Sequence, residues 1–448
     1  MNLRPYQADL FNAMRHSLAT GHRRIMCVAP CGAGKSVIMQ AIVESAQIKR
    51  NTVLILVHRQ EIVDQLAERM KPYNNATVMM MQTAVRRLDT LPTPSIIIID
   101  ESHLIKANSY MRILEHFSQS YALYFTATPQ RLDGKGFDDV ADDLIQSVSV
   151  RWLITNGYLA PFEYYAPKTL LDASQLAVKQ GEYDGKQAAA MLDKPKIYGD
   201  VIHEYRKHAD GLQAIAFCSS VEHSQRTADA FNAAGITAAH VDGKMTKNQR
   251  REIVQRFRNG ETTVLCNYAI VIEGLDVPNA ACVLCLRPTQ SLTVHVQSVM
   301  RCMRPASGKV ARILDFVGNY ERLGLPDDER EWSLHGRKKR TRQKEQNTIR
   351  ARVCENCFRT YAGNGRICPY CGHEQPKTQA EIEHDERAEL ERITAENRKQ
   401  KRMEVGRART VDDLKVIARE RGYKSGWVYR MARAKHIPTG GQHVRVQD

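Results

Sequence analysis

The sequence contains no long hydrophobic run. Its longest apolar candidates, residues 52–57 and 95–99, have the length of a strand, whereas a membrane-spanning helix needs ~18 or more consecutive apolar residues. The N-terminal stretch MNLRPYQADL also lacks the apolar core of a secretory signal. We therefore expect no membrane partner and a cytoplasmic location.

Acidic residues are scarce relative to basic ones. The chain of 448 residues has 65 Lys and Arg against 50 Asp and Glu, which gives a formal net charge of +15. Such an excess suggests a polyanionic partner, usually nucleic acid, although a merely basic protein has the same composition. Residues 326–448 carry +9 of this charge. The 43% hydrophobic and 26% charged residues exclude a disordered or fibrous chain, and the length predicts about three domains.

Eleven cysteines without a secretory signal argue against a disulfide scaffold. Four of them form the pattern CxxC-x10-CxxC, namely Cys354, Cys357, Cys368 and Cys371. Two such turns can aim four thiolates at one tetrahedral centre, so the pattern predicts a structural zinc ribbon that binds Zn²⁺. The alternative is four buried or free cysteines. Cys282 and Cys285 repeat the spacing on an apolar strand, where core packing is favoured.

Short apolar runs alternate with amphipathic stretches in two parts of the chain. In the first part, strands are predicted at 24–29, 52–57, 76–80, 95–100 and 121–126, and helices at 36–48, 60–70 and 109–118. In the second part, strands are predicted at 213–218, 237–241, 262–266, 282–286 and 310–316, and helices at 221–234, 247–258 and 292–302. This alternation predicts the α/β class, with two parallel sheets covered on both faces.

The pattern gives a division of the chain into seven parts. We expect a first lobe at 1–165, a linker at 166–196, a second lobe at 197–322, a basic linker at 323–350, the zinc ribbon at 351–376, a charged helix at 377–409 and a small basic helical module at 410–438.

A glycine-rich turn, APCGAGKS at 29–36, follows the first predicted strand. Between a strand and a helix, such a turn points backbone N–H groups at a phosphate, and the helix N-terminus adds partial positive charge. Gly32 and Gly34 would let the loop approach the nucleotide, Lys35 would reach its phosphates, and Ser36 would bind Mg²⁺. The alternative is a glycine-rich turn before an ordinary helix.

A second chemical motif, Asp-Glu-Ser-His at 100–103, ends a predicted buried strand. Carboxylates at the carboxyl end of such a strand lie where α/β sheets bind ligands. Asp100 could hold Mg²⁺ through water, and Glu101 could orient or deprotonate the attacking water. Alone, the motif could be a strand meeting a capped turn; together with the phosphate loop, it favours ATP hydrolysis.

Further stretches follow in a familiar order. They are RPYQ at 4–7, VHRQEIVDQ at 57–65, MQTAVRR at 81–87, TATP at 126–129, CNYAIVIEGLDVP at 266–278 and QSVMRCMR at 297–304. Over residues 1–320 the sequence resembles a superfamily 2 helicase of the DEAD/DEAH-box type. TATPQRLDGKG at 126–136 is similar to the phage- or restriction-associated branch, which implies a bacterial host cytoplasm. The resemblance implies two tandem RecA-like lobes that use ATP and Mg²⁺.

The resemblance also implies roles for single residues. Gln7 would read adenine, and Gly274 and Asp276 would belong to the ATP site. The implied nucleic-acid contacts are Arg59, Gln82 and Thr83, and the residues that couple hydrolysis to movement are Thr126, Thr128 and Gln297.

Arg301 and Arg304 match the two arginines that this family brings to the γ-phosphate. A guanidinium that stabilises the charge of phosphoryl transfer raises the rate by roughly 10³–10⁵. Spaced three apart on a helix, the two would share one face. The alternative is a pair of surface arginines. Met300 and Cys266 stand where the family usually has glycine and threonine, which could alter coupling or rate.

The C-terminal segment predicts two short helices. Thr410 and Asp413 form a capping-box pattern, Gly422 fits a helix end, and a second helix is expected from Trp427 to about Lys435. Basic residues interleaved with aromatic ones suit a nucleic-acid contact, but a small packing hairpin explains them equally well.

These observations predict an ATP-dependent helicase or translocase on nucleic acid, with DNA favoured over RNA. Two alternatives stay open. One is a duplex-translocating motor subunit of a restriction, defence or replication assembly, which would need a partner for cleavage because this chain shows no nuclease pattern. The other is a zinc-ribbon nucleic-acid-binding protein with an ATP-gated switch. Replication, recombination or defence proteins are possible partners.

Overall fold

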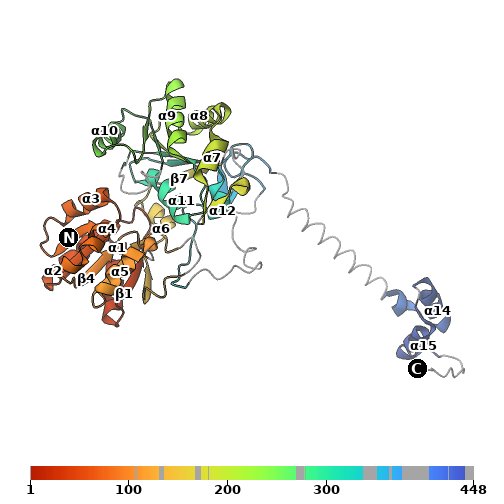
Figure 1. Ribbon diagram of the computed structural model, residues 1–448. Helices are drawn as coiled ribbons and strands as arrows, with labels where there is room; N and C mark the ends of the chain where they lie inside the picture. Colours follow the sequence, from red (N-terminus) through yellow and green to blue (C-terminus); the bar gives the residue numbers. More distant parts are fainter. Residues whose placement is uncertain are drawn as a thin grey trace. The chain divides into compact units, whose positions relative to one another are not determined.

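A computed structural model describes residues 2–105, 108–130, 136–166, 173–179, 181–268, 277, 279–335, 351–362, 366–375, 403–421 and 423–438 (Figure 1). The chain divides into two compact units, Met1–His373 and Glu374–Asp448. The first unit contains both lobes and the cysteine-rich hairpin. None of the described helices has the length and hydropathy needed to cross a membrane.

Lobe 1 is a parallel six-stranded sheet of order β3-β2-β4-β5-β1-β6. Its strands are β1 (Arg24–Val28), β2 (Val53–Val57), β3 (Ala76–Met80), β4 (Ile96–Ile99), β5 (Tyr121–Thr126) and β6 (Asp143–Gln146). One face packs against α1 (Pro5–Ala19), α2 (Lys35–Ile48) and α3 (Gln60–Met70). The other face packs against α4 (Met81–Arg86) and α5 (Asn108–His116). Apolar runs buried on both faces produce this sandwich.

Lobe 2 repeats the architecture with the strand order β11-β12-β10-β13-β14-β7. Its strands are β7 (Phe162–Tyr165), β10 (Ala214–Cys218), β11 (Ala238–Val241), β12 (Val264–Asn267), β13 (Cys282–Leu286) and β14 (Ala311–Asp315). Helices α8 (Pro195–Ala209) and α9 (Val221–Ala233) cover one face, and α10 (Lys247–Arg258) and α11 (Leu292–Val299) cover the other. The two tandem RecA-like lobes predicted from the sequence are confirmed, and one apolar cluster runs through both.

The connection between the lobes is more structured than the expected linker at 166–196. It contains the hairpin β8 (Val178–Lys179) and β9 (Glu182–Tyr183), followed by α7 (Gly185–Leu192). Strand β7 pairs with β14 in the second sheet, although the expected boundary at residue 165 puts it in lobe 1. Its sequence, FEYY, has polar positions and is half-buried, so it lacks the apolar signal of the central strands.

The cysteine-rich hairpin, β15 (Ala351–Val353) and β16 (Thr360–Ala362), docks on the outer edge of β7. The N–H of Ala166 donates to the carbonyl of Phe358 at 3.0 Å. Arg359 pairs with Glu163 on β7. The hairpin forms its own two-stranded sheet and covers part of the edge of β7 through an isolated bridge between Tyr165 and Arg359.

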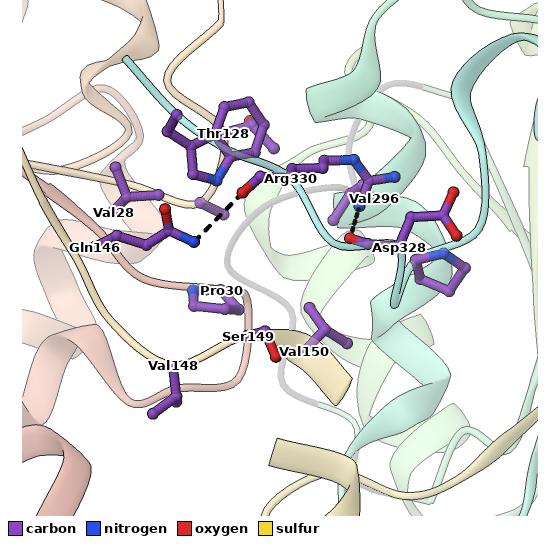
Figure 2. A pocket seen from close by; sticks show the side chains of 13 residues that line it. Val28, Pro30, Thr128, Gln146, Val148, Ser149, Val150, Val296, Asp328 and Arg330 are labelled. Atoms are coloured by element: carbon purple, nitrogen blue, oxygen red, sulfur yellow. Dashed lines mark hydrogen bonds between the residues drawn. The ribbon is translucent and has the colours of Figure 1, made fainter. Parts of the chain in front are cut away.

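Residues 324–335, which we call the strap, return from lobe 2 to lobe 1. The N–H of Phe137 donates to the carbonyl of Leu334 at 2.6 Å, and Gln146 Nε2 donates to the carbonyl of Arg330 at 3.4 Å. Figure 2 shows the cavity that the strap closes with Thr128 and other lobe 1 residues, and with Val296 of α11. This described part of the expected basic linker is thus docked between the lobes.

In the second unit, α14 (Val411–Glu420) packs against α15 (Ser425–Ala434). The predicted capping box is confirmed, because Thr410 accepts from the N–H of Asp413 and Asp413 from that of Thr410. Lys435 Nζ donates to three carbonyls at residues 405, 406 and 408, so it secures the preceding turn. Gly422 and the expected charged helix up to residue 402 lie outside the described residues.

Candidate nucleotide and nucleic-acid site

The predicted site residues of lobe 1 follow neighbouring strands at one edge of the sheet. Lys35 follows β1, Asp100 and Glu101 follow β4, and Thr126 ends β5. These three strands are adjacent, in the order β4-β5-β1. The carboxyl ends of parallel strands meet at one edge, which is where open α/β sheets bind ligands.

The glycine-rich loop contains two residues in a left-handed backbone conformation, which glycine adopts more easily than other residues. Gly32 and Gly34 have φ values of +83° and +80°. A Cβ at Gly34 would lie 2.5 Å from Nε2 of Gln7. Gln7 Nε2 and the Tyr6 hydroxyl both donate to the carbonyl of Ala33, at 3.0 and 3.1 Å. Helix α1 therefore holds the loop from behind, and Gln7, predicted to read adenine, also shapes the loop.

Lys35, at the start of α2, reaches across to Glu101. Lys35 Nζ lies 3.4 Å from Glu101 Oε1, and both side chains are largely buried. Burial works to lower the pKa of Lys35, but the nearby carboxylates of Glu101 and Asp100 outweigh it and raise that pKa. The pKa of Glu101 is lowered: burial opposes this, and Lys35 with His103 overcomes it. Both groups are thus held in their charged forms.

The two acidic residues sit in different environments. Burial raises the pKa of Asp100 despite the opposing charge of Lys35. The N–H of Glu101 donates to Asp100 Oδ1 at 3.0 Å. Glu101 itself has φ +51° and ψ 48°, a left-handed conformation that is strained for a residue with a Cβ. Backbone strain of this kind concentrates at functional sites.

Two hydrogen bonds that involve the predicted coupling residues join lobe 1 to lobe 2. Gln297 Nε2 on α11 donates to Glu101 Oε2 at 3.0 Å. The hydroxyls of Thr128 and Thr293 are 2.6 Å apart, and the N–H of Thr128 donates to Thr126 Oγ1 at 3.1 Å. One contact between the lobes therefore involves Glu101 and another involves Thr128, and both reach α11.

The two arginines lie beside the phosphate loop but not on one helix. α11 ends at Val299, and Met300–Met303 form a 3₁₀ turn that ends at Arg304. The pair stands on a 3₁₀ turn instead of the expected α-helix, and in such a turn positions three residues apart also lie on one face. Arg304 Nη1 would still lie 3.7 Å from a Cβ at Gly32. The charges of both arginines also act on Cys31 of the loop.

The predicted nucleic-acid contacts lie further along the same sheet edge. Arg59 immediately precedes α3 after β2, and Gln82 and Thr83 lie in α4 after β3. β2 and β3 are neighbours at the end of the sheet away from the phosphate loop. Gly274 and Asp276 lie outside the described residues.

The structure adds residues that sequence reasoning missed. Tyr6 holds the phosphate loop, and Thr293 contacts Thr128. His103 Nδ1 lies 3.4 Å from Glu101 Oε2. His103 is part of the Asp-Glu-Ser-His motif, so that motif was the signal that could have found it. Thr293 carries no local signal, because its partner is 165 residues away in the sequence.

The four predicted zinc ligands gather at one point of the hairpin. All their sulfur atoms lie within 4.8 Å of one another. Cys354 and Cys371 Sγ are 3.5 Å apart, and Cys357 and Cys368 Sγ are 3.8 Å apart. Zn–S bonds of ~2.3 Å in a tetrahedron require sulfur separations of about 3.8 Å. The four-cysteine cluster therefore fits the zinc ribbon expected from the sequence.

Comparison with known proteins identifies both lobes. The family described as "Type III restriction enzyme, res subunit" matches residues 1–90 and 78–131, and "Helicase conserved C-terminal domain" matches residues 193–306. A 51.5 kDa protein of a Lactococcus phage (isolate 7-9) is 38% identical, over 92% of this chain and 89% of its own length.

More distant proteins share the two-lobe part. IRC3 of Saccharomyces cerevisiae, named as a candidate ATP-dependent helicase, is 29% identical over 70% of this chain; the match spans 51% of the yeast protein. A fragment of a candidate HsdR subunit of a type I restriction enzyme from Vibrio vulnificus superposes with a TM-score of 0.59 at 21% identity. That superposition covers 72% of this chain and 66% of the fragment.

The phosphate loop, the carboxylate pair and the second lobe's arginines meet in one cleft, and the matches cover both lobes. The chain therefore belongs to the superfamily 2 helicases, in the branch with phage and restriction-enzyme relatives.

Proposed function

We propose that this protein is an ATP-dependent helicase or translocase that acts on DNA and hydrolyses ATP between its two lobes. The observation that carries the proposal is the hydrogen bond from Gln297 of lobe 2 to Glu101 of lobe 1. Glu101, the proposed general base, belongs to lobe 1 and is held by Gln297 of lobe 2. Hydrolysis and movement of the lobes are therefore mechanically linked.

Each site residue has a role in this proposal. Lys35 holds the phosphates at the start of α2, and Glu101, kept ionised by Lys35, orients and deprotonates the attacking water. Asp100 and Ser36 would hold Mg²⁺, which shields the charge that develops during phosphoryl transfer. Arg301 and Arg304 approach from lobe 2 and stabilise the transferred phosphoryl group.

In this proposal, hydrolysis moves lobe 2 relative to lobe 1, and this movement shifts the bound nucleic acid. Thr126 and Thr128 connect the carboxylate edge with α11. Arg59, Gln82 and Thr83 hold the nucleic-acid backbone at the far end of the same sheet edge. DNA is favoured as the substrate because the matched family and the Vibrio vulnificus structure are named as restriction enzymes, which act on DNA.

The decisive experiment is an ATPase assay with single-stranded, duplex, forked and RNA substrates. DNA should stimulate hydrolysis by the wild-type chain, and Lys35→Ala and Glu101→Gln should abolish it. Gln297→Ala should separate the steps: DNA still binds, but stimulation falls by about tenfold. Hydrolysis that ignores every nucleic acid would overturn the proposal.

A second candidate is a motor that translocates along duplex DNA without separating its strands. The restriction-enzyme relatives favour it. Displacement of a labelled strand from a fork supports unwinding. Displacement of a triplex-forming strand from an intact duplex, without fork opening, supports duplex translocation.

A further inference from the structure

The chain crosses from lobe 1 to lobe 2 at residues 156–161, which we call the crossing segment. This segment follows α6 (Val150–Thr155), and β7 begins directly after it. Leu159 and Ala160, in the middle of the segment, are 2% and 3% exposed. Because buried side chains are closely packed, a movement of one lobe relative to the other must act on these residues.

Leu159 packs against the phosphate loop of lobe 1. A Cβ at Gly32 would lie 2.7 Å from Leu159 Cδ2, so the leucine side chain fills the space beside the loop backbone. The same Cβ would lie 3.7 Å from Arg304 Nη1. Gly32 is therefore flanked on one side by Leu159 and on another by an arginine of lobe 2.

Ala160 is bonded to the turn that carries the two arginines. Its N–H donates to the carbonyl of Met303 at 2.9 Å, and Met303 directly precedes Arg304. The carbonyl of Pro161, the next residue, accepts from the N–H of Ala311 on β14 at 2.8 Å. From Ala160 onward, the backbone of the crossing segment is thus attached to lobe 2.

An aromatic cluster attaches the other end of the crossing segment to lobe 1. The ring centroid of Tyr158 lies 5.0 Å from that of Tyr6 and 5.8 Å from that of Trp152. The Arg4 guanidinium lies over the Tyr158 ring, 4.7 Å from its centroid. Tyr6 also donates to the carbonyl of Ala33 in the phosphate loop. The start of α1 therefore holds both the loop and the crossing segment.

We propose that Leu159 is a positioning residue for ATP hydrolysis, which sets the position of Arg304 relative to the phosphate loop. Leu159 packs on the loop, and the residue after it is bonded to the arginine turn, so one peptide bond joins the two halves of the site. This inference rests on the proposed function, because it names a further residue of the same ATP site.

The proposed role separates hydrolysis from ATP binding. An arginine that stabilises the transferred phosphoryl group acts in the transition state. A displacement of about 1 Å from the productive geometry can lower the rate by about 100-fold. Loss of the Leu159 side chain should therefore lower kcat, whereas the phosphate loop, held by α1, should still bind ATP.

The test compares hydrolysis and binding of ATP by the full chain at saturating DNA. Leu159→Ala should lower kcat about tenfold, while the Kd for N-methylanthraniloyl-ATP with Mg²⁺ should change by less than about twofold. Leu159→Met, which nearly conserves the side-chain volume, should keep kcat close to wild type.

A double-mutant cycle tests whether Leu159 acts through Arg304. Leu159→Ala/Arg304→Ala should hydrolyse ATP at the rate of Arg304→Ala, because the leucine has no arginine left to position. Single-turnover hydrolysis of radiolabelled ATP by excess protein measures these slow rates.

Leu66 on α3 provides the matched control, because it is another leucine of lobe 1 and is 4% exposed. Leu66→Ala should lower the melting temperature as Leu159→Ala does and should keep kcat close to wild type. Thermal melting shows whether each variant is folded at the assay temperature. If Leu159→Ala does not fold, Leu159→Val, which lacks one methylene group, should show a smaller loss of kcat with the same dependence on Arg304.

The outcomes separate this inference from the proposed function. The inference is overturned, and the motor proposal stands, if Leu159→Ala lowers kcat equally with and without Arg304 or weakens ATP binding as much as it lowers kcat. Hydrolysis that no nucleic acid stimulates overturns the motor proposal. The double-mutant cycle measured on that basal hydrolysis then still decides the role of Leu159.

Discussion

At the scale of single residues, the two neighbouring carboxylates of the site have pKa values shifted in opposite directions. Lys35 and Glu101 neutralise each other at 3.4 Å. Asp100, the residue before Glu101, accepts a hydrogen bond from the N–H of Glu101, and burial raises its pKa despite the charge of Lys35. A buried carboxylate that is not fully compensated destabilises the fold but leaves its oxygens ready for a metal ion.

The incompletely compensated charge of Asp100 predicts that neutralising this residue increases stability and decreases activity. Asp100→Asn should raise the free energy of unfolding by about 1 kcal/mol, because a neutral amide avoids the cost of burying a charge. ATP hydrolysis should fall by about 100-fold, since an amide is a weaker Mg²⁺ ligand. Thermal melting and ATPase assays measure both effects. Asp89→Asn, at an exposed site of the same lobe, should change neither, and a destabilised Asp100→Asn variant would contradict the argument.

At the scale of elements, the ribbon is an attachment to an edge rather than part of the core. β7 pairs with β14 over four residues without any help from the ribbon. The ribbon adds one backbone hydrogen bond from Ala166, a hydrogen bond from the Thr360 hydroxyl to the carbonyl of Tyr164, and the pair between Arg359 and Glu163. The second sheet should therefore keep its structure when the ribbon loses its order.

Zinc removal tests this arrangement. We expect one zinc per chain, lost on treatment with a strong chelator or in Cys354→Ser/Cys371→Ser. Nucleic-acid binding should weaken while basal ATP hydrolysis persists, and adding zinc back to the wild-type chain should restore binding. Metal analysis and ATPase assays give the readouts. Simultaneous loss of basal hydrolysis would mean instead that the ribbon holds lobe 2 together.

At the scale of the whole molecule, buried histidines make the stability of the fold depend on pH. Lobe 2 buries two histidines, His223 and His295, and burial lowers the pKa of each to about 4. The unfolded chain binds these protons with a pKa of about 6.5. As the pH falls, these histidines become protonated in the unfolded state before they do so in the folded state. The free energy of unfolding therefore decreases as the pH falls from about 6.5 toward 4.

The expected loss is about 2 kcal/mol for each histidine between about pH 7.5 and about pH 5. Urea unfolding followed by circular dichroism at both pH values measures it. His295→Gln, which can still donate to the carbonyl of Gly324, should lower the pH dependence by about half. The exposed His116→Gln variant is the control. Equal stability at both pH values would show that these histidines are not buried as neutral groups.

Strands made of apolar residues were predictable from the sequence, and two edge strands with polar residues were not. Residues 121–126 and 282–286 were predicted as strands and form β5 and β13 with those bounds, because these central strands are uninterrupted apolar runs. β6 and β7, with sequences DLIQ and FEYY, lie at sheet edges, where half-buried polar residues erase that signal. The predicted helix 292–302 was too long, because its last turn is 3₁₀.

The sequence by itself determined which residues carry the chemistry and at which strand ends they stand. Local patterns are sufficient for this, since a glycine-rich turn or a carboxylate pair depends on its immediate neighbours. Only the tertiary structure decided which of them meet across the lobes. Gln297 and Glu101 are 196 residues apart, and the left-handed backbone of Glu101 has no local cause. Contacts of this kind depend on how two separately folded sheets pack, which no short stretch of sequence encodes.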